Sequence, residues 1–286
     1  MPIPDNDMRI RLKATAFVIY YHTDLTKARQ FLLDFGLSIA REDPQNQIFF
    51  KGYGVEPFVY IARQADGKSS FEGAAYEVES HHVYLIHGQQ KKEAEPPALK
   101  KLVVNYEDEK PRKGKFQRFE LGPAPVHRWG HYGVTYPDGA YQQMYDWYTK
   151  TLALAPSDIV YKDDKPITCF FHIDRGLEYT DHHAFFFKRV KPDYEPTVAH
   201  SAFETHDFDV EHLGHDYLES KGYESCWGVG RHVLGSQVFD YWFDTSEFIL
   251  EHYADGDLVN AETEVSHVPA GPQALKIWGP PIPGVF

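Results

Sequence analysis

The sequence predicts an α+β protein of two domains, each made of two β-α-β-β-β units. The chain has 286 residues, about twice the usual length of a single domain. A strand followed by an amphipathic helix, first seen at residues 17–35, returns from residue 131. Apolar residues make up 42% of the chain and aromatic residues 15%, which permits a sizeable core and excludes a disordered chain. We expect residues 1–120 and 121–286 to form the two domains.

The first and third units begin with a strand and a helix. Residues 17–21 (FVIYY) form an apolar run of strand length, and the apolar residues of 26–35 recur at helical spacing. The third unit repeats this pattern with HYGVTY at 131–136, a turn at 137–139 and a helix beginning near Tyr141. These two stretches are therefore interpreted as copies of one supersecondary unit.

The second and fourth units open with alternating strands at 73–80 (GAAYEVES) and 200–207 (HSAFETHD). The latter leads into a helix that stops at Lys221-Gly222. Further short strands are expected at 47–50, 58–62, 167–173, 183–189, 238–243 and 248–253. A charged, Pro/Gly-rich stretch at 107–125 separates the halves, and the arm after Pro269 keeps enough apolar residues to pack on the body.

Charge and composition exclude several classes of function. Lys plus Arg total 29 and Asp plus Glu total 42, and the net charge of −13 disfavours nucleic acid and membranes as partners. No apolar run approaches the roughly 20 residues of a membrane-spanning helix, and the first ten residues lack the pattern of a secretory signal. Two cysteines do not indicate a disulfide framework, so we expect a cytoplasmic protein.

Four strands of the second half carry a residue that can bind a metal among aromatic residues. These are His131 in HYGVT, His183 in HAFFF, His200 in HSAFE and Glu251 in FILEHY. Burying a carboxylate such as Glu251 is costly unless it is paired, protonated or bound to a metal. Two imidazoles and one carboxylate on neighbouring strands could form a facial triad, which leaves coordination positions open for small molecules. Alternatively, each histidine is an ordinary buried residue satisfied by hydrogen bonds.

Comparison of the units favours the metal-ligand interpretation. Where the fourth unit has His200, the second has Gly73, and where the third unit has His131, the first has Ala16 or a neighbour. The scaffold can therefore dispense with imidazole at these places, so a functional role explains the histidines better than packing does.

Five motifs of the second half occur in an order that resembles a known family. GHYGV, DHHAFFF, HSAFE, GRHVLGSQVFDYW and FILEHY are similar to the motifs of type I extradiol ring-cleavage dioxygenases of the vicinal oxygen chelate superfamily, such as catechol 2,3-dioxygenases and 2,3-dihydroxybiphenyl 1,2-dioxygenases. The resemblance implies curved, partly closed mixed sheets around a central cavity, and a first domain without metal. It also implies His131, His200 and Glu251 as ligands of Fe(II), with Mn(II) as an alternative.

The same resemblance implies roles for the other motif residues. His183 would be the catalytic acid/base, and His232 and Tyr241 would position the substrate and oxygen. Phe185, which strand alternation places on the face of His183, would contact the substrate. The implied reaction is extradiol (meta) cleavage of a catechol by O2, giving a muconic semialdehyde-type product. We also expect a homo-oligomer, and an uncharged catechol because no Arg or Lys clearly falls at a carboxylate clamp.

Two other functions stay open at this stage. A glyoxalase-like isomerase or epimerase on the same scaffold would use Zn or Ni as a Lewis acid, and a fourth protein ligand would favour it. A binding protein without catalytic activity would keep the aromatic cavity, but it would not need a proton donor such as His183 beside the metal.

The assigned roles also make a geometric prediction. Tyr241 and Glu251 lie on consecutive strands, and opposed residues of an antiparallel pair face the same side of a sheet. A loop made of residues 244–247 alone would oppose Tyr241 to Leu250 and turn it away from Glu251. We therefore expect an odd-length loop or a bulge here.

Overall fold

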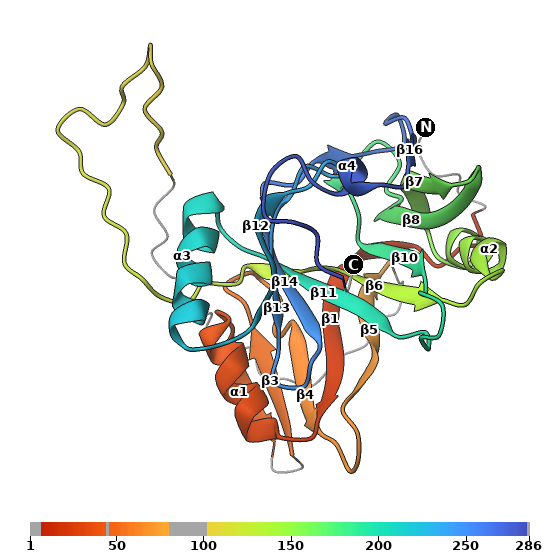
Figure 1. Cartoon of the computed structure of the whole chain (residues 1–286), viewed down its shortest axis with the longest axis horizontal. Helices are drawn as coiled ribbons and strands as arrows, with labels where there is room; N and C mark the ends of the chain where they lie inside the picture. Colours follow the sequence, from red (N-terminus) through yellow and green to blue (C-terminus); the bar gives the residue numbers. More distant parts are fainter. Residues whose placement is uncertain (1–6, 44–45, 80–101, 285–286) are drawn as a thin grey trace.

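Mixed β-sheets with helices at the periphery form the body of the protein (Figure 1). The computed structural model describes residues 7–43, 46–79 and 102–284. The first sheet has the strand order β2-β3-β4-β1-β5. Its strands are β1 (Leu12–His22), β2 (Ser38–Asp43), β3 (Gln47–Lys51), β4 (Tyr60–Gln64) and β5 (Ser70–Val78), and helix α1 (Leu25–Asp34) connects β1 to β2.

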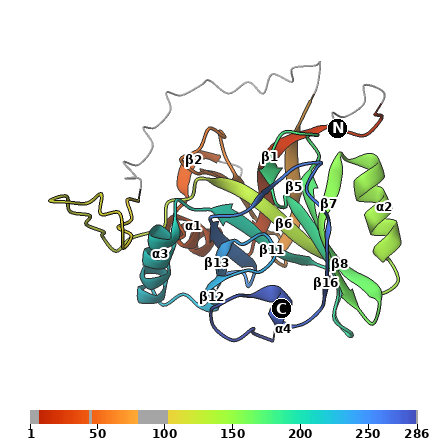
Figure 2. The ribbon, with the colours of Figure 1, turned by 90° about the horizontal axis from the view of Figure 1, so that it is seen from above.

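The second sheet has the strand order β12-β13-β14-β11-β6-β10-β8-β7-β16. Its strands are β6 (Arg128–Tyr136), β7 (Leu154–Lys162), β8 (Lys165–Ile173), β10 (Phe185–Arg189), β11 (Val198–Glu204), β12 (Ser225–Arg231), β13 (Val238–Phe243), β14 (Ile249–Ala254) and β16 (Ser266–Pro269). The short strands β9 (Thr180–Asp181) and β15 (Leu258–Val259) pair with each other. Helices α2 (Tyr141–Thr151) and α3 (Phe208–Ser220) lie on opposite flanks, and α4 (Pro272–Leu275) lies in the C-terminal arm (Figure 2).

The strand pairing repeats as the internal sequence repeat predicts. The first strand of a unit pairs in parallel with the last strand of the same unit, as in β1 with β4, β6 with β10 and β11 with β14. The first strands of successive units pair antiparallel, as in β1 with β5 and β6 with β11. Three of the four units are therefore complete in the described residues. The second unit contributes β5, and residues 80–101 after it lie outside the described part of the chain.

The helix ends follow from local side-chain chemistry. Asp207 precedes α3, and its carboxylate accepts a hydrogen bond from the main-chain N–H of Val210 at 2.9 Å, as an N-cap residue does. The helix ends before Gly222, which has a φ of +79°, a backbone conformation that glycine adopts at little cost. The stop at Lys221-Gly222 expected from the sequence is therefore confirmed.

The two halves of the chain share an apolar core. Phe35, the C-cap residue of α1, packs edge-on against Phe203 of β11, with ring centroids 5.8 Å apart, and stacks on His252 of β14. Nε2 of His252 donates a hydrogen bond to the carbonyl oxygen of Phe35 at 2.7 Å. Successive residues of a strand point to opposite faces of the sheet. Because His252 is held against Phe35, the neighbouring Glu251 points to the opposite face of β14.

An extended segment connects the halves. Residues 102–127 contain no helix or strand, and much of the segment projects from the body as a long loop (Figure 1). The segment rejoins the body where the N–H of Val126 donates to the carbonyl of Gly36 at 3.1 Å. Among the described residues, no helix has both the length and the apolar composition needed to span a bilayer.

Candidate metal centre and its cavity

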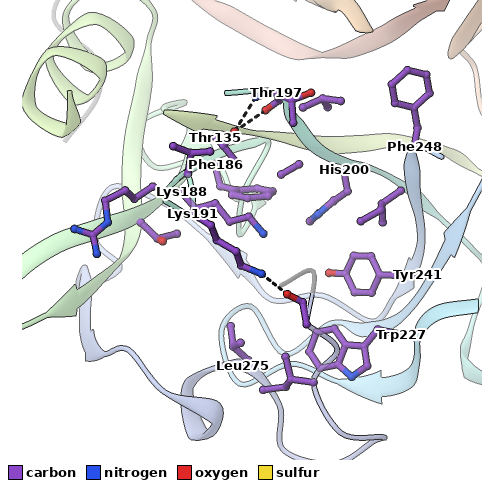
Figure 3. Close-up of a pocket in the computed structure, with 18 of the residues that line it drawn as sticks. Thr135, Phe186, Lys188, Lys191, Thr197, His200, Trp227, Tyr241, Phe248 and Leu275 are labelled. Atoms are coloured by element: carbon purple, nitrogen blue, oxygen red, sulfur yellow. Dashed lines mark hydrogen bonds between the residues drawn. The ribbon is translucent and has the colours of Figure 1, made fainter. Parts of the chain in front are cut away.

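A cavity of about 1510 Å³ lies against the second sheet (Figure 3). Residues of β6, β7, β8, β10, β11, β12, β13 and β14 line it, together with residues between 270 and 284 of the C-terminal arm. In Figure 3, Phe186 and Lys188 lie on one side of the cavity, and His200 and Tyr241 lie on the other. The wall is therefore largely apolar and aromatic, with a few polar groups.

Three neighbouring strands bring His131, His200 and Glu251 to one face of the sheet. The central strand β11 places Ala202 opposite His131 of β6 and also beside Glu251 of β14. His200 lies two residues before Ala202, so it shares the same face. The small side chain of Ala202 leaves room for the three larger side chains to converge above it.

The three side chains converge with their ligand atoms close together. Oε2 of Glu251 lies 3.1 Å from Nε2 of His131 and 3.2 Å from Nε2 of His200, and the two nitrogens are 3.4 Å apart. Glu251 is fully buried, and its Oε1 has no hydrogen-bond partner among the described residues. A buried carboxylate with an unsatisfied oxygen and two imidazole nitrogens aimed at one point is a donor set that suits a divalent transition metal.

Electrostatics keep Glu251 ionised at this site. Burial opposes its ionisation, but the interactions with His131 and His200 outweigh burial and hold the pKa of Glu251 well below its usual range. Burial lowers the pKa of His200 to about 4, so its imidazole is neutral at neutral pH. A carboxylate anion and a neutral imidazole are the protonation states in which these groups bind metals.

Tyr241 lies next to the candidate metal ligands His200 and Glu251, as the predicted role requires. Tyr241 of β13 directly opposes Glu251, and Phe243 opposes Ile249, which leaves residues 244–248 as the connecting loop. The loop has five residues, so the predicted odd length is confirmed. Burial, and next the charge of Glu251, raise the pKa of Tyr241 well above its usual value, so the phenol keeps its proton.

His232 is held between Tyr241 and the C-terminal arm. Its Nδ1 lies 2.6 Å from the carbonyl oxygen of Leu275 and its Nε2 lies 2.9 Å from the hydroxyl oxygen of Tyr241. A carbonyl can only accept, so Nδ1 carries a proton, and in the neutral imidazole Nε2 accepts from Tyr241. The arm, which the sequence showed only as packing on the body, therefore sets the tautomer of a site residue.

Asp244, in the same loop, gives the folded protein a pH-dependent stability. Burial raises its pKa to about 7, although the N–H groups of Ser246 and Phe248 donate to its Oδ1. An unfolded chain ionises this carboxyl near 3.8, so stability decreases as pH rises from there to about 7. We expect Asp244→Asn, which can keep both hydrogen bonds, to increase the free energy of unfolding by about 1–3 kcal/mol at about pH 8.

Urea denaturation of metal-free protein at about pH 5 and about pH 8 measures this effect. The gain should shrink at the lower pH. Asp216→Asn, at an exposed aspartate of α3, is the control and should change stability little at either pH. An equal effect of Asp244→Asn at both pH values would contradict the prediction.

His183 lies in the cavity wall beside His131, one of the candidate metal ligands. Its ring centroid is 4.0 Å from that of His131, and its Nδ1 lies 3.0 Å from Nδ1 of His182. Burial and next the charge of His131 hold the pKa of His183 well below the usual value of imidazole. The position fits a neutral imidazole that can exchange a proton with a bound molecule.

The position of Phe185 corrects the prediction that it contacts the substrate. Phe185 is fully buried beneath α2, where its ring stacks on Tyr148 with centroids 4.0 Å apart. Strand β10 begins only at Phe185, so the alternation assumed from His183 does not hold across the preceding residues. The neighbouring Phe186 lines the cavity instead.

Gly133 makes room for the ring of Phe186. The two residues are paired on β6 and β10, and a Cβ at Gly133 would lie 1.8 Å from Cζ of Phe186. We expect Gly133→Ala to push this ring into the cavity, to lower stability by about 1–3 kcal/mol and to raise KM. Urea denaturation and steady-state kinetics measure both effects. Gly67→Ala, where a Cβ meets nothing within 4 Å, is the control, and equal behaviour of the two variants would contradict the prediction.

The chain resembles known proteins in sequence and in structure. No family model matches the chain. Metapyrocatechase 2 of Cupriavidus necator is 34% identical over 149 residues, which cover 51% of this chain and 42% of the relative. The chain thus matches less than half the length of this curated relative.

Three solved structures resemble this chain over at least 91% of its length. The Mn(II)-bound glyoxalase from Novosphingobium aromaticivorans has a TM-score of 0.74 and 18% identity, covering 97% of this chain and 94% of the other. Homoprotocatechuate 2,3-dioxygenase from Brevibacterium fuscum, in an anaerobic substrate complex, has a TM-score of 0.72 and 15% identity, covering 98% and 92%. The 2,3-dioxygenase LapB from Pseudomonas sp. KL28 has a TM-score of 0.69 and 14% identity, covering 91% and 98%.

The chain has the vicinal oxygen chelate fold. The α+β class and the resemblance to extradiol dioxygenases, both predicted from the sequence, are thus confirmed.

Within this vicinal oxygen chelate fold, Lys188 is a cavity residue that the sequence analysis missed. It follows Phe186 by two positions on β10, so both side chains reach the cavity from the same face (Figure 3). Burial and next the charge of Lys191 lower the pKa of Lys188 to about 8, so it is mainly an ammonium at neutral pH. Strand alternation counted from Phe186, instead of from Phe185, places Lys188 on the cavity side of β10.

Proposed function

We propose that the protein is an Fe(II)-dependent extradiol dioxygenase that cleaves a catechol beside its two hydroxyl groups and inserts O2. Mn(II) is an alternative metal. The observation that carries the proposal is the convergence of His131, His200 and Glu251 next to His183 and Tyr241 in one cavity. The similarity to metapyrocatechase 2 and to extradiol dioxygenase structures supports it.

The two histidines and the glutamate would hold the metal from one side. All three come from one face of the sheet, and His131 and His200 also line the cavity. Fe(II) in such a site would supply a common centre where a diol and O2 can meet and through which electron density can pass. The aromatic wall around this centre would exclude water from the bound ring.

The remaining site residues would orient the diol and handle its protons. Nε2 of His183 is the ring nitrogen not engaged with His182, so it can take a proton from a substrate hydroxyl and return one later. Tyr241 and His232 are joined by a hydrogen bond of 2.9 Å beside His200 and Glu251, and they would position the other hydroxyl of the diol. The product would be a muconic semialdehyde-type acid.

The two competing functions have less support. A glyoxalase-like isomerase would be favoured by a fourth protein ligand, and the ligand group found in the described ranges has three members. A pure binding protein would not need His183 beside the metal site, nor the His232 and Tyr241 pair.

Aerobic incubation of iron-loaded protein with catechols tests the proposal. Catechol, methylcatechols, 2,3-dihydroxybiphenyl and homoprotocatechuate form a sufficient panel, and a yellow ring-fission product with equimolar O2 uptake is the expected result. The controls are protein treated with a chelator and protein reloaded with Zn(II). Absence of O2 uptake with every catechol, together with isomerisation of a thiol adduct of a ketoaldehyde by the Zn(II) form, would support the glyoxalase alternative instead.

Lys188 provides a test of the substrate class. Its ammonium would favour catechols with an acidic substituent, in contrast to the uncharged catechol expected from the sequence. We expect Lys188→Met to lower kcat/KM for homoprotocatechuate about 10- to 100-fold, the weight of a charged hydrogen bond, and to change that for 4-methylcatechol little. Lys162→Met, at an exposed lysine lining the cavity, is the control. Equal losses with both substrates would contradict the prediction.

We further propose a homo-oligomer located in the cytoplasm. The connecting segment exposes Tyr106, Phe116, Phe119 and Leu121, each more than half exposed, and a second copy could cover them. Residues 110–118 carry five basic and no acidic side chains, which complements a chain of net charge −13. Two free cysteines are compatible with a reducing compartment. Light scattering of the wild type should give the mass of a multimer, and Phe116→Ser and Phe119→Ser should weaken its association. A wild-type monomer would contradict the oligomer. Cell fractionation tests the location.

A further inference from the structure

A buried chain of polar groups leads from His183 to Asp158. Nδ1 of His183 lies 3.0 Å from Nδ1 of His182, and Nε2 of His182 lies 2.5 Å from Oδ2 of Asp158. The three residues are between 4% and 6% exposed, so water does not compete for these contacts. Asp158 belongs to β7, which lies five strands away from β14, the strand of Glu251, in the order of the sheet. Within the described part of the chain, Asp158 makes no hydrogen bond or ion pair with His131, His200 or Glu251.

The surroundings hold His182 in one orientation. Its N–H donates to the carbonyl of Asp257 at 3.0 Å, and its carbonyl accepts from Oγ of Ser157 at 2.6 Å. The main chain at Gly235 packs against the ring of His182. A Cβ at Gly235 would lie 2.8 Å from Nδ1 of His182, so any residue other than glycine would clash with the ring. The imidazole therefore cannot turn away from Asp158 without displacing its neighbours.

The chain of contacts dictates where the protons lie. Nε2 of His182 and Oδ2 of Asp158 are at ion-pair distance, although Oδ2 makes no hydrogen bond of good geometry among the described residues. Two lone pairs would repel each other at 2.5 Å and a carboxylate oxygen can only accept, so the proton belongs on Nε2 of His182. In a neutral imidazole the other nitrogen is then an acceptor, so Nδ1 of His182 accepts from Nδ1 of His183. Nε2 of His183 is thereby left without a proton. A buried aspartate selects a histidine tautomer in the same way in serine protease triads.

We propose that Asp158 and His182 are positioning residues that hold His183 in the tautomer protonated on Nδ1, so that its Nε2 enters the reaction as a base. The tautomer follows from the contacts alone, whereas its use in ring cleavage rests on the proposed function. Asp158 and His182 would thus act through His183 and need not touch the substrate.

Replacement of Asp158 by Asn tests the proposal. An amide N–H can donate to Nε2 of His182, which moves the proton of His182 to Nδ1 and reverses its hydrogen bond to His183. Two-bond 1H–15N correlation spectra of the full-length protein, with and without diamagnetic Zn(II), report the tautomer of each ring. We expect the wild type to show His183 protonated on Nδ1 and Asp158→Asn to show it protonated on Nε2.

Ser157→Ala is the matched control, because Ser157 neighbours Asp158 and its hydroxyl contacts the carbonyl of His182 and Nδ1 of His172, but not the ring of His182. It should leave the tautomer unchanged. In the iron-loaded enzyme we expect Asp158→Asn to lower kcat about 10- to 100-fold, with KM and iron content unchanged. The wild-type spectrum decides the proposal even if the variant does not fold: protonation of His183 on Nε2, or the same tautomer in wild type and Asp158→Asn, overturns it. A protein with the expected tautomers but no ring cleavage would refute the proposed function and leave this inference standing.

Discussion

Replacing Glu251 by Gln is expected to remove most of the bound metal and to lower turnover at least about 100-fold. Loss of a residue that merely supports a metal ligand costs about 10- to 100-fold, so loss of a ligand should cost no less. The amide also lacks the negative charge that offsets a divalent ion, and its NH2 group would face the nitrogens of His131 and His200. Metal analysis of the purified variant and O2 uptake with a catechol measure the two losses.

Glu211 provides a matched control for this experiment. It is also a fully buried glutamate, but burial raises its pKa well above the usual value, so it is already a neutral acid. Its Oε2 accepts from Oγ1 of Thr205 at 3.2 Å, an interaction that an amide oxygen can replace. We therefore expect Glu211→Gln to keep its metal. Full metal content in Glu251→Gln would show that Glu251 is not a ligand.

The sequence singled out the three candidate metal ligands because strand alternation is a strong constraint when both faces of a sheet are buried. A glutamate in the apolar strand FILEHY has no ordinary place in a core, and comparison of the repeated units singled out His131 and His200. The parity of the loop between β13 and β14 followed from the assumption that Tyr241 faces Glu251. These predictions depend on the alternation of apolar residues along a strand and on the pairing of consecutive strands, and both can be read from the sequence.

Other features depend on where a strand begins or on main-chain groups, which the sequence does not mark. Alternation was counted from His183, but β10 begins at Phe185, so Phe186 and Lys188 reach the cavity in place of Phe185. The carbonyl of Leu275, which holds His232, could belong to any residue type. The contact between His182 and Asp158 joins residues on separate segments of the chain, and no sequence motif predicts it.

Replacing His183 by Phe is expected to separate metal binding from chemistry. His183 lies beside His131 but is not one of the three residues whose ligand atoms converge, so the variant should bind iron as the wild type does. Phenylalanine fills the site with an aromatic ring but offers no nitrogen to exchange a proton. Turnover should therefore fall by roughly two to four orders of magnitude, the usual contribution of a positioned acid/base.

The distribution of this loss between kinetic constants identifies its cause. If His183 acts on protons during the reaction, kcat should carry most of the loss while KM for the catechol changes little. His212→Phe, at an exposed histidine of α3, is the control and should leave both constants and the iron content unchanged. A His183→Phe enzyme with wild-type kcat would remove His183 from the mechanism. A variant without iron would instead show that the ring of His183 supports the metal-ligand residues, because His131 packs directly against it.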